Sequence, residues 1–257
     1  MSKLNFSIGC DPEIFLADQD NRVKSVIGLL GGDKWHPVKL TEVGHAVLED
    51  NVAVEFNIPP CNTFDDFRKE VRRTMEMVHS LLPNNLHFIS DSAISFPAEE
   101  LNCEAAWVFG CEPDNNAWTM CENEKPHAED KNLRSAGGHI HVGSDLAIAD
   151  PINTIRAMDL FLGVPSTQLD SGTLRRELYG KAGAFRFKPY GVEYRTLSNF
   201  WIFSDNLIQW AYDGTRKALE FIHSGREIPA DHGEMIQACI NNNDKNAYHE
   251  LSHLYAI

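Results

Sequence analysis

Hydrophobic and polar positions alternate with a period of two in several short segments of the chain. In residues 52–58, for example, the even positions are all apolar, whereas Glu55 lies on the opposite, polar side. This alternation is typical of a strand with one buried face. Similar segments predict further strands at residues 5–16, 138–143, 184–188 and 192–197.

Apolar residues recur at three- and four-residue steps elsewhere, which predicts amphipathic helices. One helix is expected to begin after Thr63, with Asp66 completing the cap, and to end before Pro83. Others are predicted at residues 151–162, at 204–225 with Ser204 as the cap, and in shorter pieces over 233–257. Because no regular strand–helix–strand alternation appears, we predict an α+β fold with a mainly antiparallel sheet, built as a single domain over residues 1–257.

Composition narrows the class of protein. With 43% hydrophobic and 23% charged residues over a length of 257, the chain has enough apolar material for a sizeable core and is not expected to be disordered. Its formal net charge of −14 argues against a DNA, RNA or membrane-surface binder. No secretory signal and no apolar run long enough to span a bilayer is found, so a cytoplasmic location is expected.

Several chemistry-bearing residues fall two positions apart on the predicted strands, so both members of each pair face the same side of a sheet. The pairs are Asp11 with Glu13, His139 with His141, and Glu193 with Arg195. Carboxylates and an imidazole beside arginines suit Mg²⁺ or Mn²⁺ and a phosphate-bearing substrate. Taken singly, each acid also fits a turn, a solvated position or a surface ion pair. The histidine pair is flanked by glycines on both sides, and this pattern favours a functional role over a purely structural one.

Other patterns give weaker signals. The glycine-rich, basic run at residues 179–186 is by itself a weak indication of phosphate binding, and neither GxxxxGK[ST] nor GxGxxG occurs. Most of the six cysteines are expected to be reduced and buried. A zinc knuckle from Cys103, Cys111, Cys121 and His127 is a minor alternative because its spacing is wide and unequal.

Five segments and one arginine together resemble a known family. They are Gly9-Cys-Asp-Pro-Glu13, Asp50-Asn-Val-Ala-Val-Glu55-Phe-Asn, Gly110-Cys-Glu-Pro-Asp114-Asn-Asn-Ala-Trp118, and Gly137-Gly-His-Ile-His-Val-Gly143 followed by Arg186 and Tyr190-Gly-Val-Glu-Tyr-Arg195. This set is similar to the carboxylate-amine ligases of the glutamine synthetase fold, and within them to the phage-type amidoligases, or COOH.NH2 ligases of type 2. The resemblance covers residues 5–215 and leaves a helical tail at 216–257.

The resemblance implies a glutamine synthetase-like catalytic domain, whose mainly antiparallel sheet forms an active-site cup with flanking helices. It implies metal ligands at Asp11, Glu13, Glu55, His139 and Glu193. It implies that Arg186 and Arg195 hold nucleotide phosphate and the acyl-phosphate, with catalytic roles. We add His141 and Tyr179 as expected nucleotide contacts. The attacking amine must lose a proton, and Asp50 is our candidate acceptor. Asp-Pro-Glu stands where better-known ligases carry Glu-x-Glu, and its proline removes one donor from the strand ladder.

The activity implied is an ATP-dependent ligation with Mg²⁺ or Mn²⁺. ATP would convert a carboxylate into an acyl-phosphate, which an amine would then attack. The partners expected are a small-molecule or peptide carboxylate and an amine, in the host cytoplasm if the chain is phage-encoded. Three alternatives stay open: a phosphotransferase on the same fold, a non-catalytic binding protein that retains the fold, and a metal-dependent hydrolase. The sequence does not indicate an oligomeric state.

Overall fold

The structure is a computed structural model that describes residues 4–107, 114–124, 129–170 and 172–257. The strands are β1 (Ser7–Asp18), β2 (Val23–Lys24), β3 (Val38–Lys39), β4 (Ala46–Asp50), β5 (Ala53–Asn57), β6 (Leu86–Ile89), β7 (Ala93–Ser95), β8 (Asn115–Asn116), β9 (Leu133–Ser135), β10 (Gly138–Gly143), β11 (Ala184–Lys188) and β12 (Gly191–Tyr194). The α-helices are α1 (Phe64–Leu81), α2 (Asp145–Ala149), α3 (Pro151–Met158), α4 (Val164–Leu169), α5 (Thr173–Leu178), α6 (Asp205–His223), α7 (Ala230–Asn242) and α8 (Lys245–Tyr255). Short 3₁₀ turns η1 (Ala98–Leu101), η2 (Glu104–Trp107) and η4 (Asn199–Phe203), and a π-helical turn η3 (Asp159–Gly163), complete the elements.

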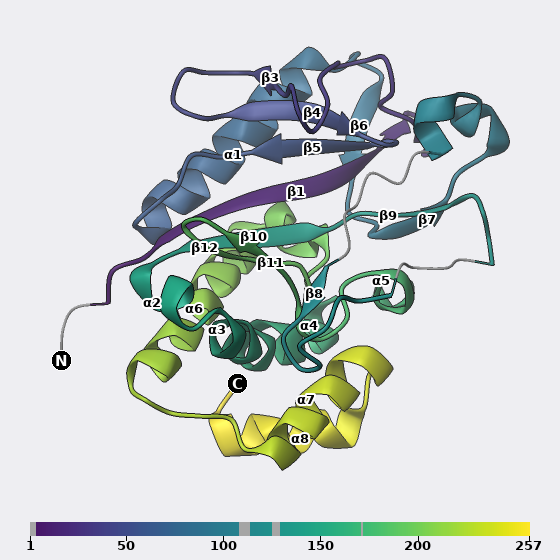
Figure 1. Cartoon of the computed structure of the whole chain (residues 1–257). Helices are drawn as coiled ribbons and strands as arrows, with labels where there is room; N and C mark the ends of the chain where they lie inside the picture. The colour runs from purple at the N-terminus through teal and green to yellow at the C-terminus, as the bar shows by residue number, and fades with distance from the viewer. Residues whose placement is uncertain (1–3, 108–113, 125–128, 171) are drawn as a thin grey trace.

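One large sheet organises the molecule, with strands in the order β3-β4-β5-β1-β10-β12-β11-β8 and with β2 and β6 paired to the far end of β1 (Figure 1). The strand pairs defined within the described residues are antiparallel. A separate small sheet pairs β7 with β9. The mixed architecture with a mainly antiparallel sheet is therefore confirmed.

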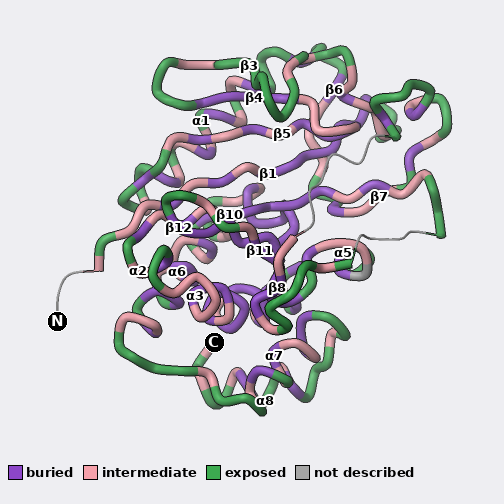
Figure 2. Tube along the Cα trace, in the orientation of Figure 1, coloured by how far each residue is buried: buried purple, intermediate pink, exposed green. Residues whose placement is uncertain are grey.

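The central strands are amphipathic, as their period of two predicts. On β1 and β10, Ile8, Cys10, Ile140 and Val142 point to one face and join the main hydrophobic cluster. Helices α2, α3 and η4 contact this face of the central strands, and α6 packs against α3 and η4 behind them. Figure 2 shows the central strands as largely buried, while the loops beside β3 and much of α8 are exposed. The opposite face carries the polar side chains.

The two long predicted helices begin where their caps place them. Thr63 accepts a hydrogen bond from the backbone N–H of Asp66 at the start of α1. Ser204 likewise accepts from the N–H of Leu207 at the start of α6. Each cap satisfies a donor that the first helical turn leaves without a partner.

Two predicted boundaries differ from the structure. The strand predicted to reach Leu197 keeps regular pairing only to Tyr194, although Leu197 still accepts a hydrogen bond from the N–H of Gly138. The helix predicted over 151–162 changes at Asp159 into the π-helical turn η3 and continues as α4. Strand β4 was not predicted, because its five residues combine three apolar and two acidic positions in blocks and do not alternate.

The C-terminal helices α7 and α8 pack on each other, and α7 also packs on η3 and α4. Residues from all four elements form a smaller hydrophobic cluster. In Figure 1 α7 and α8 lie on the side of the molecule away from β3 and β4. Among the described residues, no helix combines the length and the apolar character needed to cross a membrane.

Candidate active site

The polar face of the sheet brings together acids and histidines that are far apart in the sequence. Strand pairing places three pairs directly opposite one another: Asp11 with His139, Glu13 with Glu55, and His141 with Glu193. Directly paired side chains on one face of a sheet lie close enough to interact. The two-residue spacing in the sequence therefore does put these predicted residues on one face.

Three carboxylates form the acidic cluster, defined as Glu13, Asp50 and Glu55. One oxygen from each lies within 4.8 Å of the others. Asp50 reaches this position because β4 and β5 form a tight hairpin, in which Asn51 adopts a left-handed conformation (φ 56°) that asparagine tolerates. Glu13 also accepts a hydrogen bond from the backbone N–H of Gly137 (2.6 Å).

Burial and mutual repulsion disfavour the ionised forms of this cluster. Burial, followed by the nearby charge of Glu13, raises the pKa of Asp50 to about 7. Burial, with added repulsion from Asp11 and Asp50, raises the pKa of Glu55 well above its usual range. Crowded carboxylates of this kind hold a proton or a cation between them. The donor set therefore fits a hard divalent cation.

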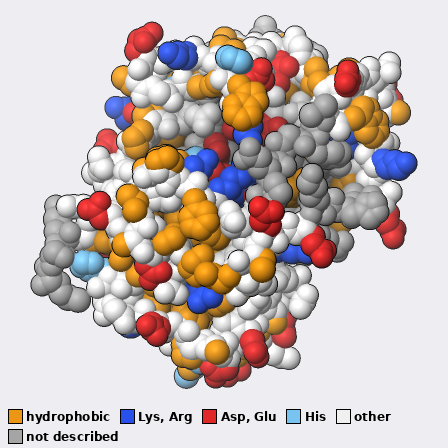
Figure 3. All heavy atoms as spheres, viewed as in Figure 1, with side chains coloured by type: hydrophobic (Ala, Val, Ile, Leu, Met, Phe, Trp, Pro, Cys, Tyr) orange, Lys and Arg blue, Asp and Glu red, His pale blue; other side chains and the backbone are white. Residues whose placement is uncertain are grey.

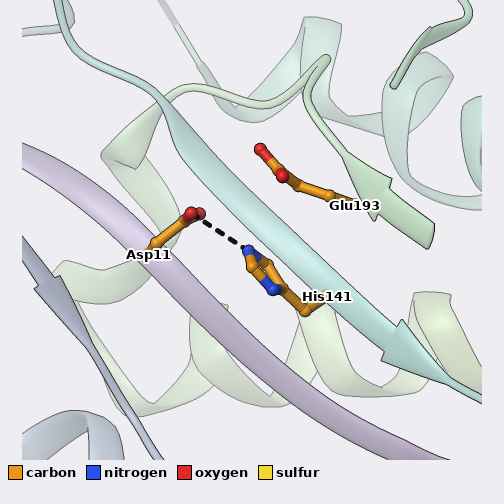
Figure 4. A group of neighbouring side chains, drawn as sticks. All are labelled: Asp11, His141 and Glu193. Carbon is orange, nitrogen blue, oxygen red and sulfur yellow. Dashed lines mark ion pairs between the residues drawn. The ribbon is translucent and has the colours of Figure 1, made fainter. Parts of the chain in front are cut away.

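A second group, the imidazole cluster, consists of Asp11, His141 and Glu193 (Figure 4), again with one ligand atom from each within 4.8 Å. His141 Nε2 lies 3.1 Å from Asp11 Oδ2, and His141 Nδ1 lies 2.6 Å from the hydroxyl of Tyr190. Burial would raise the pKa of Asp11, but the neighbouring His141 and then His139 hold it well below its usual range. Asp11 is thus an ionised carboxylate facing imidazoles.

His139 lies between the imidazole cluster and the basic groups. Its Nδ1 is 3.2 Å from Asp11 Oδ1 and 3.8 Å from Glu193 Oε1. The glycine before the strand makes room for the ring, because a Cβ on Gly137 would lie 2.2 Å from His139 Nε2. The neighbouring Gly138 is equally constrained, since its Cβ would lie 2.2 Å from the carbonyl oxygen of Ser198. These contacts explain the glycine pair beside the histidines.

Basic side chains surround Glu193 at the β12–β11 end of the face. Arg195 pairs with Glu193 and, through Nε, with Asp114 (2.7 Å). Lys188 Nζ lies 2.5 Å from Glu193 Oε2, and Arg186 lies 3.6 Å from Asp114 and 3.9 Å from Glu193. Burial and Asp11 would raise the pKa of Glu193, but Arg195 and the histidines lower it to about 2. Figure 3 shows basic and acidic side chains gathered in a hollow near the centre of the view.

The charge of the side chains on the polar face therefore changes from negative to positive across the sheet. The acidic cluster lies on β4, β5 and β1, the histidines lie on β10, and the basic side chains lie on β11 and directly after β12. Such an arrangement offers a cation site at one end and an anion site at the other, joined by imidazoles and carboxylates. It suits a reaction on a phosphate-bearing substrate with a divalent metal.

Three residues near the site were not among the predicted set. Lys188 is two positions from Arg186 on the same strand, so the same spacing rule identifies it. Asp114 belongs to one of the family-like motifs. Arg175, on α5, has no such signal: it is buried, and its guanidinium donates to the carbonyl oxygens of Thr196 (3.0 Å) and Arg195 (3.3 Å).

The backbone of Tyr179 is placed beside α5. Tyr179 follows this helix, and its N–H donates to the carbonyl of Arg175 (2.7 Å). Two of the four residues of the zinc-knuckle alternative, Cys111 and His127, lie outside the described residues. The other two, Cys103 and Cys121, are exposed free thiols. The part of the third family-like motif before Asp114 also lies outside the described residues.

Comparisons with known proteins add a family and a structural neighbour. A family model described as Phage phiEco32-like COOH.NH2 ligase-type 2 matches residues 121–254, which is just over half of the chain. Among solved structures, the chain is similar to a bifunctional glutathione synthetase from Pasteurella multocida, with a TM-score of 0.46 and 12% sequence identity. That similarity covers 98% of this chain and 47% of the synthetase, so the chain spans about half the length of that protein. No curated protein matches the chain.

Proposed function

The chain belongs to the phage phiEco32-like COOH.NH2 ligase-type 2 family, and on this premise we propose that it is an ATP-dependent ligase that joins a carboxylate to an amine through an acyl-phosphate. The family match supports the ligase class. Beyond the ligase class, we propose that ATP is the nucleotide, that Mg²⁺ or Mn²⁺ is the metal, and that an acyl-phosphate is the intermediate.

The observation that carries the proposal is the ordered change of charge across one face of the sheet. A carboxylate is a poor electrophile, and ATP activates it by transferring a phosphoryl group. That transfer brings several negative charges into one place, which requires fixed positive charge and divalent cations. On one face of the sheet, the basic end offers the positive charge, and the acidic cluster offers ligands for a divalent cation.

We assign the metal positions to the two clusters. Glu13, Asp50 and Glu55 would hold one divalent cation, and Asp11, His141 and Glu193 would hold another, with His139 against both Asp11 and Glu193. When bound, Mg²⁺ or Mn²⁺ would neutralise phosphate charge and polarise the phosphoryl oxygens. Asp50, proposed from the sequence as a proton acceptor, here lies with two other carboxylates, so we assign it to the cation instead.

The basic residues take the anionic part of the substrates. Arg186 and Arg195 would stabilise the charge on the transferring phosphoryl group, and Lys188 would add a third positive charge on the same face. The salt bridges from Arg195 to Asp114 and Glu193 fix the direction of its guanidinium before a substrate arrives. Of the nucleotide contacts expected from the sequence, we keep Tyr179 and Arg186, and we assign His141 to the metal with Asp11 and Glu193.

We further propose that the chain acts as one catalytic domain in which the polar sheet face is the cup of a glutamine synthetase-like fold. The main hydrophobic cluster supports a single unit, because its buried members run from Ile8 on β1 to Phe221 on α6.

Mass spectrometry gives the direct test. The protein is incubated with ATP, Mg²⁺ or Mn²⁺ and pooled carboxylates, amino acids and polyamines, and the products are scored for condensation. We expect an amide product and ADP from the wild type, none from Glu193→Gln, and wild-type yield from Asp65→Asn, which removes an exposed acid on α1. A phosphorylated amine in place of an amide would identify a phosphotransferase. Failure of wild-type protein to bind ATP with either metal in calorimetry would refute the proposal.

A further inference from the structure

The charged side chain of Arg175 is buried against the segment that carries Arg195. Arg175 lies on α5 and is only 3% exposed. Its guanidinium donates hydrogen bonds to the carbonyl oxygens of Thr196 (3.0 Å) and Arg195 (3.3 Å). Within the described part of the chain, its hydrogen bonds therefore go to neutral carbonyls and not to a carboxylate. Buried charges usually pair with an opposite charge, so this arrangement needs an explanation.

A guanidinium is costly at this position. Burial lowers the pKa of Arg175 to about 10, although the nearby charge of Glu13 opposes the change. The Nε of Arg175 is also buried, and among the described residues it has no hydrogen-bond partner. An apolar side chain of similar size would fill the same space without this cost. Positions that break a local rule in this way are expected where function requires them.

The guanidinium of Arg175 fixes the chain where strand β12 ends. Regular pairing of β12 stops at Tyr194, and the next two carbonyls along the chain are those that Arg175 holds. From the neighbouring strand, the carbonyl of Ala184 accepts the N–H of Arg195 (2.9 Å). The backbone of Arg195 is thus held through both its N–H and its carbonyl. A planar fork of donors fixes two successive carbonyls together, whereas a flexible ammonium does not.

The turn after α5 is built around the same guanidinium. Gly180 has a φ of 74°, and a Cβ on it would lie 2.0 Å from Nη1 of Arg175 and 2.5 Å from the carbonyl oxygen of Thr196. Glycine suits both this backbone conformation and so close an approach. One position earlier, the N–H of Tyr179 donates to the carbonyl of Arg175 (2.7 Å). Arg175 therefore joins the turn with Tyr179 to the segment with Arg195.

We propose that Arg175 is a positioning residue of the ligase: it holds the backbone at residues 195–196 so that the side chain of Arg195 points at the transferring phosphoryl group. Ion pairs with Asp114 and Glu193 fix the guanidinium of Arg195, and Arg175 fixes the backbone from which that side chain extends. A displacement of about 1 Å in an active site can cost about a hundred-fold in rate. Arg175 itself touches no substrate. This assignment rests on the proposed function.

Nuclear magnetic resonance of protein with ¹⁵N-labelled arginine tests the placement without requiring turnover. An Nε–H held against a carboxylate exchanges slowly with water, so Arg195 should give a resolved cross-peak, which is assigned by its loss in Arg195→Lys. We expect Arg175→Gln to broaden or remove this cross-peak and Arg176→Gln to keep it. Arg176 is a matched control, because it is also buried and donates to a carbonyl, that of Ser166 (3.4 Å), on a different segment.

Kinetics of amide formation test the same role in catalysis. Arg175→Gln should lower kcat about thirty-fold or more and leave KM for ATP within about two-fold of wild type, because Arg195 acts on the transition state. Arg175→Lys keeps the charge and should fall between wild type and Arg175→Gln in both kcat and the intensity of the Arg195 cross-peak. Arg176→Gln should keep kcat within about two-fold of wild type. Far-ultraviolet circular dichroism checks that each variant is folded, and Arg175→Lys is compared alone if Arg175→Gln does not fold.

Two results would overturn the inference: an Arg195 cross-peak that is the same in wild type and in the folded Arg175 variants, or an equal loss of kcat in Arg175→Gln and Arg176→Gln. The second result would mean that Arg175 contributes to stability alone. Failure of the proposed function gives a different result. If the wild type forms no amide from ATP and any substrates tested, the ligase proposal fails, while the cross-peak comparison still decides whether Arg175 places Arg195.

Discussion

The buried carboxylate of Asp159 beneath the active site is the basis for the most detailed prediction. Asp159 is fully buried at the start of η3. It accepts hydrogen bonds from Trp118 Nε1 (2.6 Å), the N–H of Gly183 (2.6 Å), the hydroxyl of Tyr194 (2.8 Å) and the hydroxyl of Thr196 (3.2 Å). Tyr194 and Thr196 flank Arg195, so this network anchors the segment that carries a proposed catalytic arginine.

Replacement of Asp159 by alanine removes the common acceptor. The indole N–H of Trp118 and the amide N–H of Gly183 can only donate, so both lose their partner in a buried place. Each unsatisfied donor costs about 1–3 kcal/mol. The hydroxyl of Thr196 keeps the carbonyl of Lys181 (3.1 Å) as an acceptor and adds little. We therefore expect the free energy of unfolding to fall by about 4 kcal/mol.

The same residue predicts a pH dependence. Burial raises the pKa of Asp159 to about 7, despite the four hydrogen bonds that oppose the change. The pKa in the unfolded chain is about 3.9. Because the folded value is the higher one, the stability that the protonated group contributes is complete below about pH 4 and is lost as the pH rises to about 7. The loss is about 4 kcal/mol at 1.4 kcal/mol for each pH unit.

Urea denaturation followed by circular dichroism measures both effects. The Asp159→Asn variant cannot titrate, so the stability of the wild type relative to this variant should decrease from pH 5 to pH 8. Other acids titrate equally in both proteins and cancel. Asp213→Asn, which removes a partly exposed acid on α6, should change stability by less than about 1 kcal/mol. A cost below about 1 kcal/mol for Asp159→Ala, or a difference from Asp159→Asn that does not vary with pH, would refute the reasoning.

Three further predictions concern the site. Glu55→Gln should weaken Mn²⁺ binding about ten-fold in calorimetry, because one hard ligand is lost; unchanged affinity would count against the acidic cluster. In the wild type, Mn²⁺ affinity should increase from pH 6 to pH 8, because Asp50, whose pKa is about 7, must lose its proton first; a flat profile would contradict this. Arg175→Lys should reduce stability by about 1–3 kcal/mol in urea denaturation, since a single ammonium replaces a fork that serves two buried carbonyls; wild-type stability would show that the fork is dispensable.

Local sequence patterns predicted much of the fold because the rules behind them are local. The caps at Thr63 and Ser204, and the alternation on β10, depend on neighbouring residues and were confirmed. The early end of β12 could not be predicted in this way. The regular pairing of β12 stops at Tyr194. The hydroxyls of Tyr194 and Thr196, on either side of Arg195, donate hydrogen bonds to Asp159, which lies more than 30 positions away in the sequence.

For the candidate site, the sequence predicted which residues share a face but not which are neighbours. Two-residue spacing put Asp11 and Glu13 on one side of their strand. The position of His139 opposite Asp11 depends on the pairing of β1 with β10, which no local pattern encodes. Arg175 was missed because it lies on a six-residue helix that shows no periodicity.

The net charge of the chain and the positions of its charged side chains carry different information about ligands. A value of −14 argues against binding a polyanion, because such a ligand needs a broad basic surface. It does not argue against a compact phosphate. On the polar face the acids are concentrated on β4, β5 and β1, and the basic groups surround Glu193 on β12 and β11. At that end the positive charges of Arg186, Lys188 and Arg195 lie close together, so an acidic protein can still offer a local basic site for an anion and, on the same face, a carboxylate site for a cation.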